Sequence, residues 1–224
     1  MANSIRNPSV AADISPIVDV LRALLAPRTD VAVVTPDDKS ALLAAFTAAS
    51  RRVGKVPLVL DDAETARLKA AGVDWPLARR VDELWRIALL VAAATRPDVE
   101  ALVRDCFRGG DTDERRAVLR ALPLLPDPQC FAALATDACR TSVRPIFEAV
   151  ACENRFPARY LDPPAFDQMV LKALFLDVSL ARIIGLDGRR TPELERMARD
   201  YAAERRAAGR PVSDDLAHLA GERP

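Results

Sequence analysis

Along most of this chain, apolar residues recur every three or four positions. Such segments are preceded by residues that commonly begin a helix. In the segment 14–26, Ile17, Leu21 and Leu24 share that spacing, and the pattern stops before Pro27. This spacing is typical of an amphipathic α-helix, because a helix makes one turn in about 3.6 residues. The same signals predict further helices over residues 35–54, 61–71, 81–96, 97–108, 112–122, 128–141, 143–154, 163–176 and 192–208.

Proline, more than glycine, separates these segments. The chain has 17 prolines and 8 glycines, where average usage would give roughly 11 and 16 at this length. Proline is favoured in the first turn of a helix and just beyond a helix end. The one β-like run, residues 55–60, has no candidate partner strand elsewhere in the sequence, so we expect it to be an extended connection.

The predicted helices recur at a regular interval. Starts near Asp82, Thr112 and Val143 are spaced by about thirty residues, as in a stack of helical hairpins. The helix beginning near Val81 is the most apolar of the chain, with Arg86 interrupting its hydrophobic surface, so we expect it to be central. We therefore predict an all-α fold, a single domain built as an irregular HEAT-like solenoid of helical hairpins.

The sequence divides this fold into three parts. Residues 1–12 are polar and lack periodicity, so they are expected to be loose. The helical domain is expected over residues 13–210. Residues 211–224 are expected to be partly ordered at best, with one last short helix capped near Ser213.

Charge and hydropathy exclude several classes of partner. The 32 basic residues balance 32 acidic ones, which argues against nucleic acid and against an anionic membrane surface. The longest apolar stretch, Ile87 to Ala94, is far shorter than the ~20 residues of a membrane span. The N-terminus carries no export signal, so we expect a cytoplasmic protein without membrane insertion.

Few residues are suited to metal or cofactor chemistry. The four cysteines lie too far apart for a zinc motif, and we expect them to be reduced core residues. The one histidine, His218, lies near the C-terminus in a segment expected to fray. Neither a dinucleotide fingerprint nor a P-loop occurs in the sequence. We therefore expect no metal, no cofactor and no histidine-based catalysis.

Two predicted helices carry polar groups that are candidates for ligand binding. Arg144 and Glu148 are one helical turn apart, and they form either a polar pocket against Cys152 or an ordinary salt bridge. Gln168 and Lys172 share a face of a mostly apolar helix. Lys172 holds either an anionic or carbonyl ligand, or extends its amine to solvent over an apolar stem.

A third candidate is the loop over residues 183–194. Its two glycines within four residues suggest a turn with positive φ before a helix capped by Thr191. Asp187 and Arg189 belong to this loop. Arg189 and Arg190 either bind a carboxylate or phosphate, or pair with the glutamates that follow.

Motifs of the C-terminal half resemble those of the EboA family in order and approximate spacing. Over residues 141–210 the matching segments are Pro145-Ile-Phe-Glu-Ala-Val-Ala151, Asn154-Arg-Phe-Pro157-Ala-Arg-Tyr160, Gln168-Met-Val-Leu-Lys-Ala-Leu-Phe175, Gly185-Leu-Asp-Gly-Arg189 and Glu204-Arg-Arg-Ala-Ala-Gly-Arg210. Asn154 and Tyr160 become candidate ligand-binding residues through this resemblance. Asp167 departs from the family pattern, which has Asn there, and this departure implies a different ligand or affinity if the position touches ligand.

The resemblance implies a function that the residues alone do not. EboA proteins are helical and are encoded with a prenyltransferase-like membrane protein and metal-dependent hydrolase-like proteins, in clusters associated with the traffic or export of secondary-metabolite precursors. The chain is therefore expected to be a soluble, non-catalytic component that binds a small hydrophobic or aromatic metabolite, or the other proteins of its cluster.

An enzyme acting on the same precursor is the alternative. Glu148, Tyr160, Lys172 or Asp187 would then perform acid–base chemistry in a helical cavity. The scarcity of histidine and the missing cofactor motifs favour the non-catalytic reading.

Overall fold

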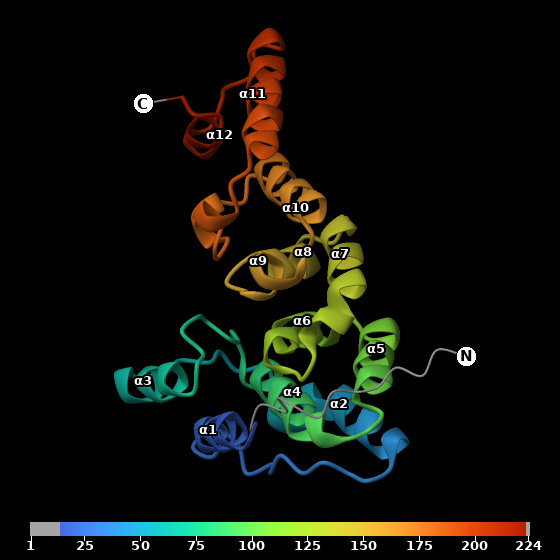
Figure 1. Ribbon diagram of the computed structural model, residues 1–224. Coiled ribbons are helices and arrows are strands. Elements are labelled where there is room, and N and C mark those ends of the chain that lie inside the picture. Colours follow the sequence, from blue (N-terminus) through green and yellow to red (C-terminus); the bar gives the residue numbers. More distant parts are fainter. Residues whose placement is uncertain (1–13, 223–224) are drawn as a thin grey trace, which may run out of the picture. The chain divides into compact units, whose positions relative to one another are not determined.

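Regular structure in residues 14–222, which the computed structural model describes, is entirely helical (Figure 1). The α-helices are α1 (Ser15–Leu25), α2 (Lys39–Val53), α3 (Asp62–Ala70), α4 (Val81–Ala92), α5 (Val99–Gly109), α6 (Thr112–Ala121), α7 (Ala132–Arg140), α8 (Arg144–Ala151), α9 (Phe156–Tyr160), α10 (Pro163–Phe175), α11 (Pro192–Ala207) and α12 (Asp214–Leu219). Short 3₁₀ helices are η1 (Ala93–Thr95), η2 (Leu122–Leu124), η3 (Pro128–Phe131), η4 (Leu180–Arg182) and η5 (Asp187–Arg189).

These bounds confirm the predicted all-α class. The segment 55–60 is extended, and within the described range its only β-type pairing is an isolated bridge between Pro57 and Arg80. The predicted helix over 143–154 is wrong at its end, because α8 stops at Ala151. The sequence reasoning missed α9, whose five residues are too few to show a helical period. The loose segment predicted over residues 1–12 lies outside the described residues.

Side-chain caps determine where many helices begin. The carboxylates of Asp61 and Asp111 each accept a hydrogen bond from the backbone N–H three residues on, and the glutamate there bonds back to the cap. Such a capping box satisfies N–H groups that have no partner within the helix. The first residue of α2 is preceded by Asp38, which is its cap in place of the predicted Thr35.

The chain forms two compact units, divided after Asp127. The first unit contains α1 to α6 and the second contains α7 to α12. The HEAT-like stacking of hairpins in one domain stays a prediction.

Helix α4 is the centre of the first unit, as predicted. It packs against α1, α2 and α6 (Figure 1). Its residues from Val81 to Val91 are all buried, and they include three charged side chains, Asp82, Glu83 and Arg86. Buried charges at the centre of a unit require partners, because the loss of hydration is costly.

A closed set of hydrogen bonds surrounds Arg86. Its guanidinium donates to Asp82 Oδ2 at 2.8 Å, to Ser50 Oγ at 2.9 Å and to the Phe46 carbonyl at 3.0 Å. Burial by itself would raise the pKa of Asp82, but hydrogen bonds from Arg80, Ser50 and Arg86 outweigh it and lower that pKa. The set ties α4 to α2.

A neighbouring set ties α4 to α6. Glu83 Oε1 lies 3.2 Å from an Arg116 nitrogen, and Glu83 Oε2 accepts from the Arg79 N–H at 2.7 Å. Asp113 of α6 pairs with Arg80 at 2.8 Å. The central helix is thus held by apolar packing and by ion pairs at its N-terminal end.

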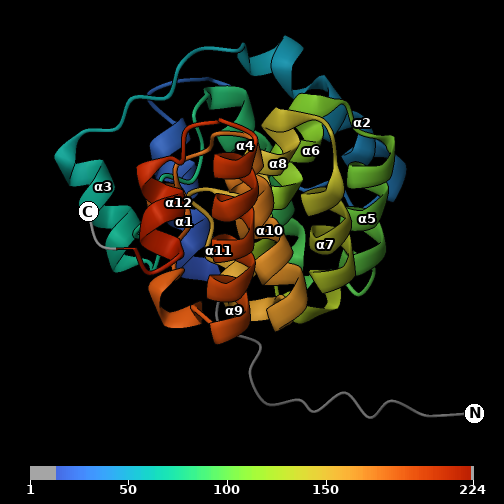
Figure 2. The same ribbon diagram turned by 90° about the horizontal axis from the view of Figure 1, so that it is seen from above.

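In the second unit, α10 packs against α7, α8 and α11, and α12 lies alongside α11 (Figures 1 and 2). The predicted last short helix is confirmed: Ser213 caps α12, and Leu216 and Leu219 are buried. Gly185 has a φ of +80°, and a Cβ there would lie 2.8 Å from Ala158 Cβ. A glycine is therefore required at this turn, as the sequence indicated.

Asp82→Ala should destabilise the first unit by about 3 to 5 kcal/mol, because Arg86 would remain buried without its carboxylate partner. Urea unfolding followed by tryptophan fluorescence measures this, since both tryptophans, Trp75 and Trp85, belong to this unit. Asp19→Ala is the control: its carboxylate is 77% exposed and 4.0 Å from the nearest cation, so a change below about 0.5 kcal/mol is expected. Equal effects would contradict the role given to the Arg86 set.

The pair between Arg28 and Glu64 should make the first unit sensitive to acid. The hydrogen bond from Arg28, at 2.7 Å, lowers the pKa of Glu64 from its usual 4.5 to about 2. The carboxylate therefore stabilises the fold above pH 4.5, and this stabilisation is lost as the pH falls from 4.5 towards 2. In Arg28→Gln the free energy of unfolding should fall less steeply over that range. Parallel pH profiles for the two proteins would contradict the assignment.

Candidate binding site

The connection between α1 and α2 borders two hollows in the first unit. Its residues 31–36 have no regular secondary structure, with Val33 buried and Val34 largely exposed. The Val31 carbonyl accepts a hydrogen bond from Trp85 Nε1 of α4 at 3.1 Å. The connection is thereby fixed against the centre of the unit while one of its faces stays open.

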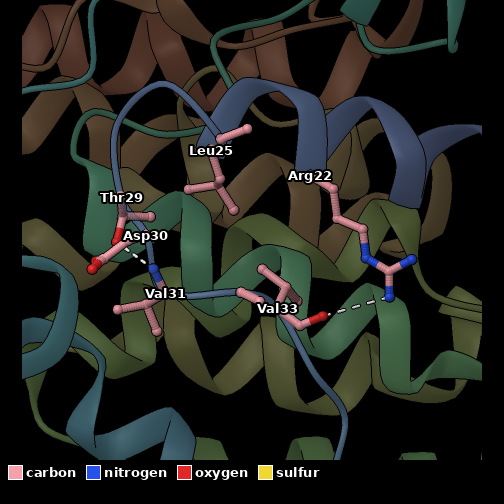
Figure 3. Close-up of a pocket in the computed structure, with 8 residues that line it drawn as sticks. Arg22, Leu25, Thr29, Asp30, Val31 and Val33 are labelled. Atoms are coloured by element: carbon pink, nitrogen blue, oxygen red, sulfur yellow. Dashed lines mark hydrogen bonds between the residues drawn. The ribbon is translucent and has the colours of Figure 1, made fainter.

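The first hollow, here called the α1 groove, lies between the end of α1 and this connection (Figure 3). Its volume is about 340 Å³. The middle of the groove is apolar, and polar groups lie at its ends. The lining residues are Arg22, Leu25, Ala26, Thr29, Asp30, Val31, Ala32 and Val33.

Figure 3 shows Arg22 and Asp30 on opposite sides of the labelled apolar residues. Arg22 Nη2 reaches the Val33 carbonyl at 3.5 Å, and the Val31 N–H donates to Thr29 Oγ1 at 3.1 Å. The groove is thus polar at both ends, with a cation at one and a carboxylate at the other.

A second hollow of about 410 Å³ lies along the same connection and shares Asp30, Val31 and Ala32 with the α1 groove. Arg52 and Trp85 contribute to its lining. Sequence reasoning proposed no site here, because the segment 27–36 contains no catalytic or metal-binding motif. The available signal was weak: the run Val31-Ala-Val-Val34 is apolar throughout and lies outside the predicted helices.

The structure places Arg144 and Glu148 as a salt bridge of 2.8 Å on an exposed face of α8. Glu148 also pairs with Arg182 at 2.9 Å, and Arg182 in turn pairs with Glu153 at 2.7 Å. Burial alone would raise the pKa of Glu148, but the hydrogen bonds from the two arginines outweigh it and lower that pKa. The carboxylate therefore stays ionised, and it joins α8 to η4.

Asn154 and Tyr160 lie around the start and end of α9. Buried Asn154 donates to the Ala149 carbonyl at 3.0 Å and accepts from the Phe156 N–H at 2.9 Å, so it links the end of α8 to α9. The ring of Tyr160 packs 5.0 Å from that of Phe156. Both contacts hold the local fold.

Gln168 and Lys172 do come together, in a hollow of about 230 Å³ between α7 and α10 that Cys139 also lines. Lys172 Nζ donates to the carbonyls of Cys139 and Thr141 at 2.7 and 2.5 Å. Burial lowers the pKa of Lys172 and raises the pKa of the Cys139 thiol to about 12. The Lys172 ammonium is therefore already hydrogen-bonded to two backbone carbonyls. The Cys139 thiol is not a ready nucleophile, because its raised pKa keeps it protonated.

Asp187 and Arg189 separate within their loop. Exposed Asp187 lines a hollow of about 310 Å³ with Arg190 and His218. Arg189 instead donates to the carbonyls of Ala158 and Leu161 at 2.8 and 2.9 Å. His218 lies in α12, whose apolar residues Leu216 and Leu219 are buried and which packs beside α11.

The predicted site residues thus do not share one cavity. Gln168 and Lys172 line one hollow and Asp187 another, and the other five are not among the lining residues of the hollows described here. Asp167, where the sequence departs from the EboA pattern, is buried and accepts from the Thr191 hydroxyl at 3.0 Å. Burial raises the pKa of Asp167, and its contact supports the N-cap of α11.

Residues 14–222 contain neither a metal-binding cluster nor a helix that could cross a membrane. In that range no three His, Cys, Asp or Glu side chains are placed to hold a metal ion. The helices there are all too short or too polar to cross a membrane.

Lys172→Met should lower the thermal stability of the second unit, because it keeps the apolar stem and leaves two carbonyls without their donor, at a cost of about 1 to 3 kcal/mol. Thermal unfolding followed by far-ultraviolet circular dichroism measures the change. Lys69→Met, on the exposed face of α3, is the matched control and should have little effect. An unchanged melting curve for Lys172→Met would mean that the two hydrogen bonds do not stabilise the unit. Lys172 would then again be a candidate ligand-binding residue.

Comparison with known proteins agrees with the motifs of the C-terminal half. Neither the curated proteins nor the solved structures include a significant match. A family model described as metabolite traffic protein EboA matches residues 26–221. The match includes the α1 groove from Ala26 onward, as well as the second unit up to residue 221. The chain therefore belongs to the EboA family.

Proposed function

We propose that this chain is a non-catalytic, cytoplasmic binding component in the traffic of a secondary-metabolite precursor, and that the α1 groove holds this cargo. The process, metabolite traffic, comes from the description of the family. The groove is the observation that carries the proposal, because it combines an apolar lining with a few polar groups. Its volume of about 340 Å³ lies at the lower end of the range typical of small-molecule sites.

The contacts of the polar side chains support binding over catalysis. General acid–base catalysis needs a titratable group within hydrogen-bond reach of the substrate. Glu148 is held by two arginines, and Lys172 by two carbonyls. Exposed Asp187 lies in a different hollow from Lys172. Glu148 and Lys172 thus hold the fold, and Lys172 and Asp187 do not line the same hollow.

Proteins of the same gene cluster are the proposed partners, including the prenyltransferase-like membrane protein that the resemblance implies. The chain would pass cargo to such a partner without changing it chemically. This role fits a chain whose described helices do not cross a membrane.

Ala26→Trp tests the groove as the cargo site. Ala26 is exposed at the end of α1 and lines the groove, so an indole there would fill the groove without disturbing the core. The tagged protein would be purified from cells that express the whole cluster, and small molecules extracted from it would be identified by mass spectrometry. A compound found with the wild-type chain should be absent from Ala26→Trp.

Ala23→Trp is the matched control, because Ala23 is also exposed on α1 but does not line the groove. It should retain the compound. Retention by both variants would exclude the groove as the cargo site, and a chemically altered compound released by the wild-type chain would favour the enzymatic alternative.

A further inference from the structure

Arg22 differs from the arginines that build the core in how weakly it is held. Its contacts with the Val33 carbonyl, at 3.5 Å, and with Asp19, at 4.0 Å, are both at the limit of a useful interaction. By contrast, Arg28 donates to two oxygens of Glu64 at 2.7 Å each. The Arg22 side chain is half exposed, so most of its five N–H donors remain available to a ligand.

The two ends of the groove carry opposite charges, and these determine how a charged ligand is oriented. Leu25, Val31 and Val33 separate the guanidinium from Asp30 (Figure 3). Asp30 is exposed, and a negative charge near it is disfavoured. A ligand with one charged end therefore has one favourable orientation, with an anionic end at Arg22 and an apolar body along the middle.

We propose that the α1 groove takes an apolar molecule with a single oxyanion end, either a carboxylate or a phosphate, and that Arg22 binds this end. The inference rests on the proposed function, since it names the class of cargo for the same groove. A planar guanidinium matches both groups, because its paired N–H donors face two oxygens at once.

Charge complementarity favours a ligand with an anionic end over a ligand with an ammonium end and over a wholly apolar ligand. A ligand with an ammonium end would face Arg22 or would have to reverse so that its charge meets Asp30, which leaves the guanidinium without a partner. A wholly apolar ligand would bind through the middle of the groove alone. An oxyanion at Arg22 meets the paired N–H donors of a weakly hydrated guanidinium, whereas an ammonium at exposed Asp30 meets a carboxylate without that paired donor geometry.

Four naphthalene probes of similar shape test the proposal with the full chain: 2-naphthoate, 2-naphthyl phosphate, 2-naphthalenemethanol and 2-naphthylmethylammonium. Calorimetric titration at low salt measures each affinity. At least one anionic probe should bind about three- to fivefold more tightly than the alcohol, as expected for a partly exposed charge pair. The ammonium probe should bind no better than the alcohol.

Arg22→Gln should remove the advantage of the anionic probe and leave the affinity for the alcohol unchanged. Arg108→Gln, at an arginine that is 79% exposed on α5 and outside the groove, should change neither. Equal affinities for all four probes in the wild-type chain, or an anionic preference that survives Arg22→Gln, would overturn the proposal.

Ala26→Trp separates this proposal from the proposed function. If it abolishes binding of the alcohol while charge has no effect on affinity, the groove binds apolar molecules and only the oxyanion class is wrong. If no probe binds, or if Ala26→Trp leaves every affinity unchanged, the groove itself is excluded as the site and both proposals fail.

Discussion

Both units depend on hydrogen bonds from cationic side chains to backbone carbonyls where helices end. The last carbonyls of a helix have no partner within it, and with 8 glycines among 224 residues the chain has few residues for glycine-type caps. Arginine and lysine from other turns or helices provide the missing donors. Examples are Arg28 to Leu24, Arg115 to Phe107, Lys172 to Cys139, Arg189 to Ala158 and Arg190 to Leu219.

Contacts of this kind, together with ion pairs, explain why several polar residues that stand out in the sequence hold the fold. A guanidinium has donors enough for a carbonyl and a carboxylate together, and Arg86 uses them on Phe46, Ser50 and Asp82 at once. Lys172 and Arg189 are each committed to two carbonyls. Arg22 has no comparable commitment, and it lies beside an apolar groove. The polar side chains best placed to bind a ligand are therefore those that make few contacts within the fold, such as Arg22.

Local interactions account for what was predictable. The start of α3 at its capping box, the start of α10 behind Asp162 and the end of α1 before a proline all depend on residues within one turn of each other. The long-range pairs were not predictable, because Asp82 and Ser50 are 32 residues apart and Arg182 and Glu148 are 34 apart. Any of the 32 basic residues was a possible partner for a given carboxylate until the helices had packed.

The sequence by itself therefore determined the helical class, most helix boundaries, the central place of α4 and the resemblance that the match over residues 26–221 confirms. Only the tertiary structure decided which charges are buried, which carbonyls they bind and where an open groove remains. The physical reason is that helix formation and capping are local, so that neighbouring residues suffice to read them. A groove is what packing leaves between elements, and its lining depends on contacts that no short stretch of sequence contains.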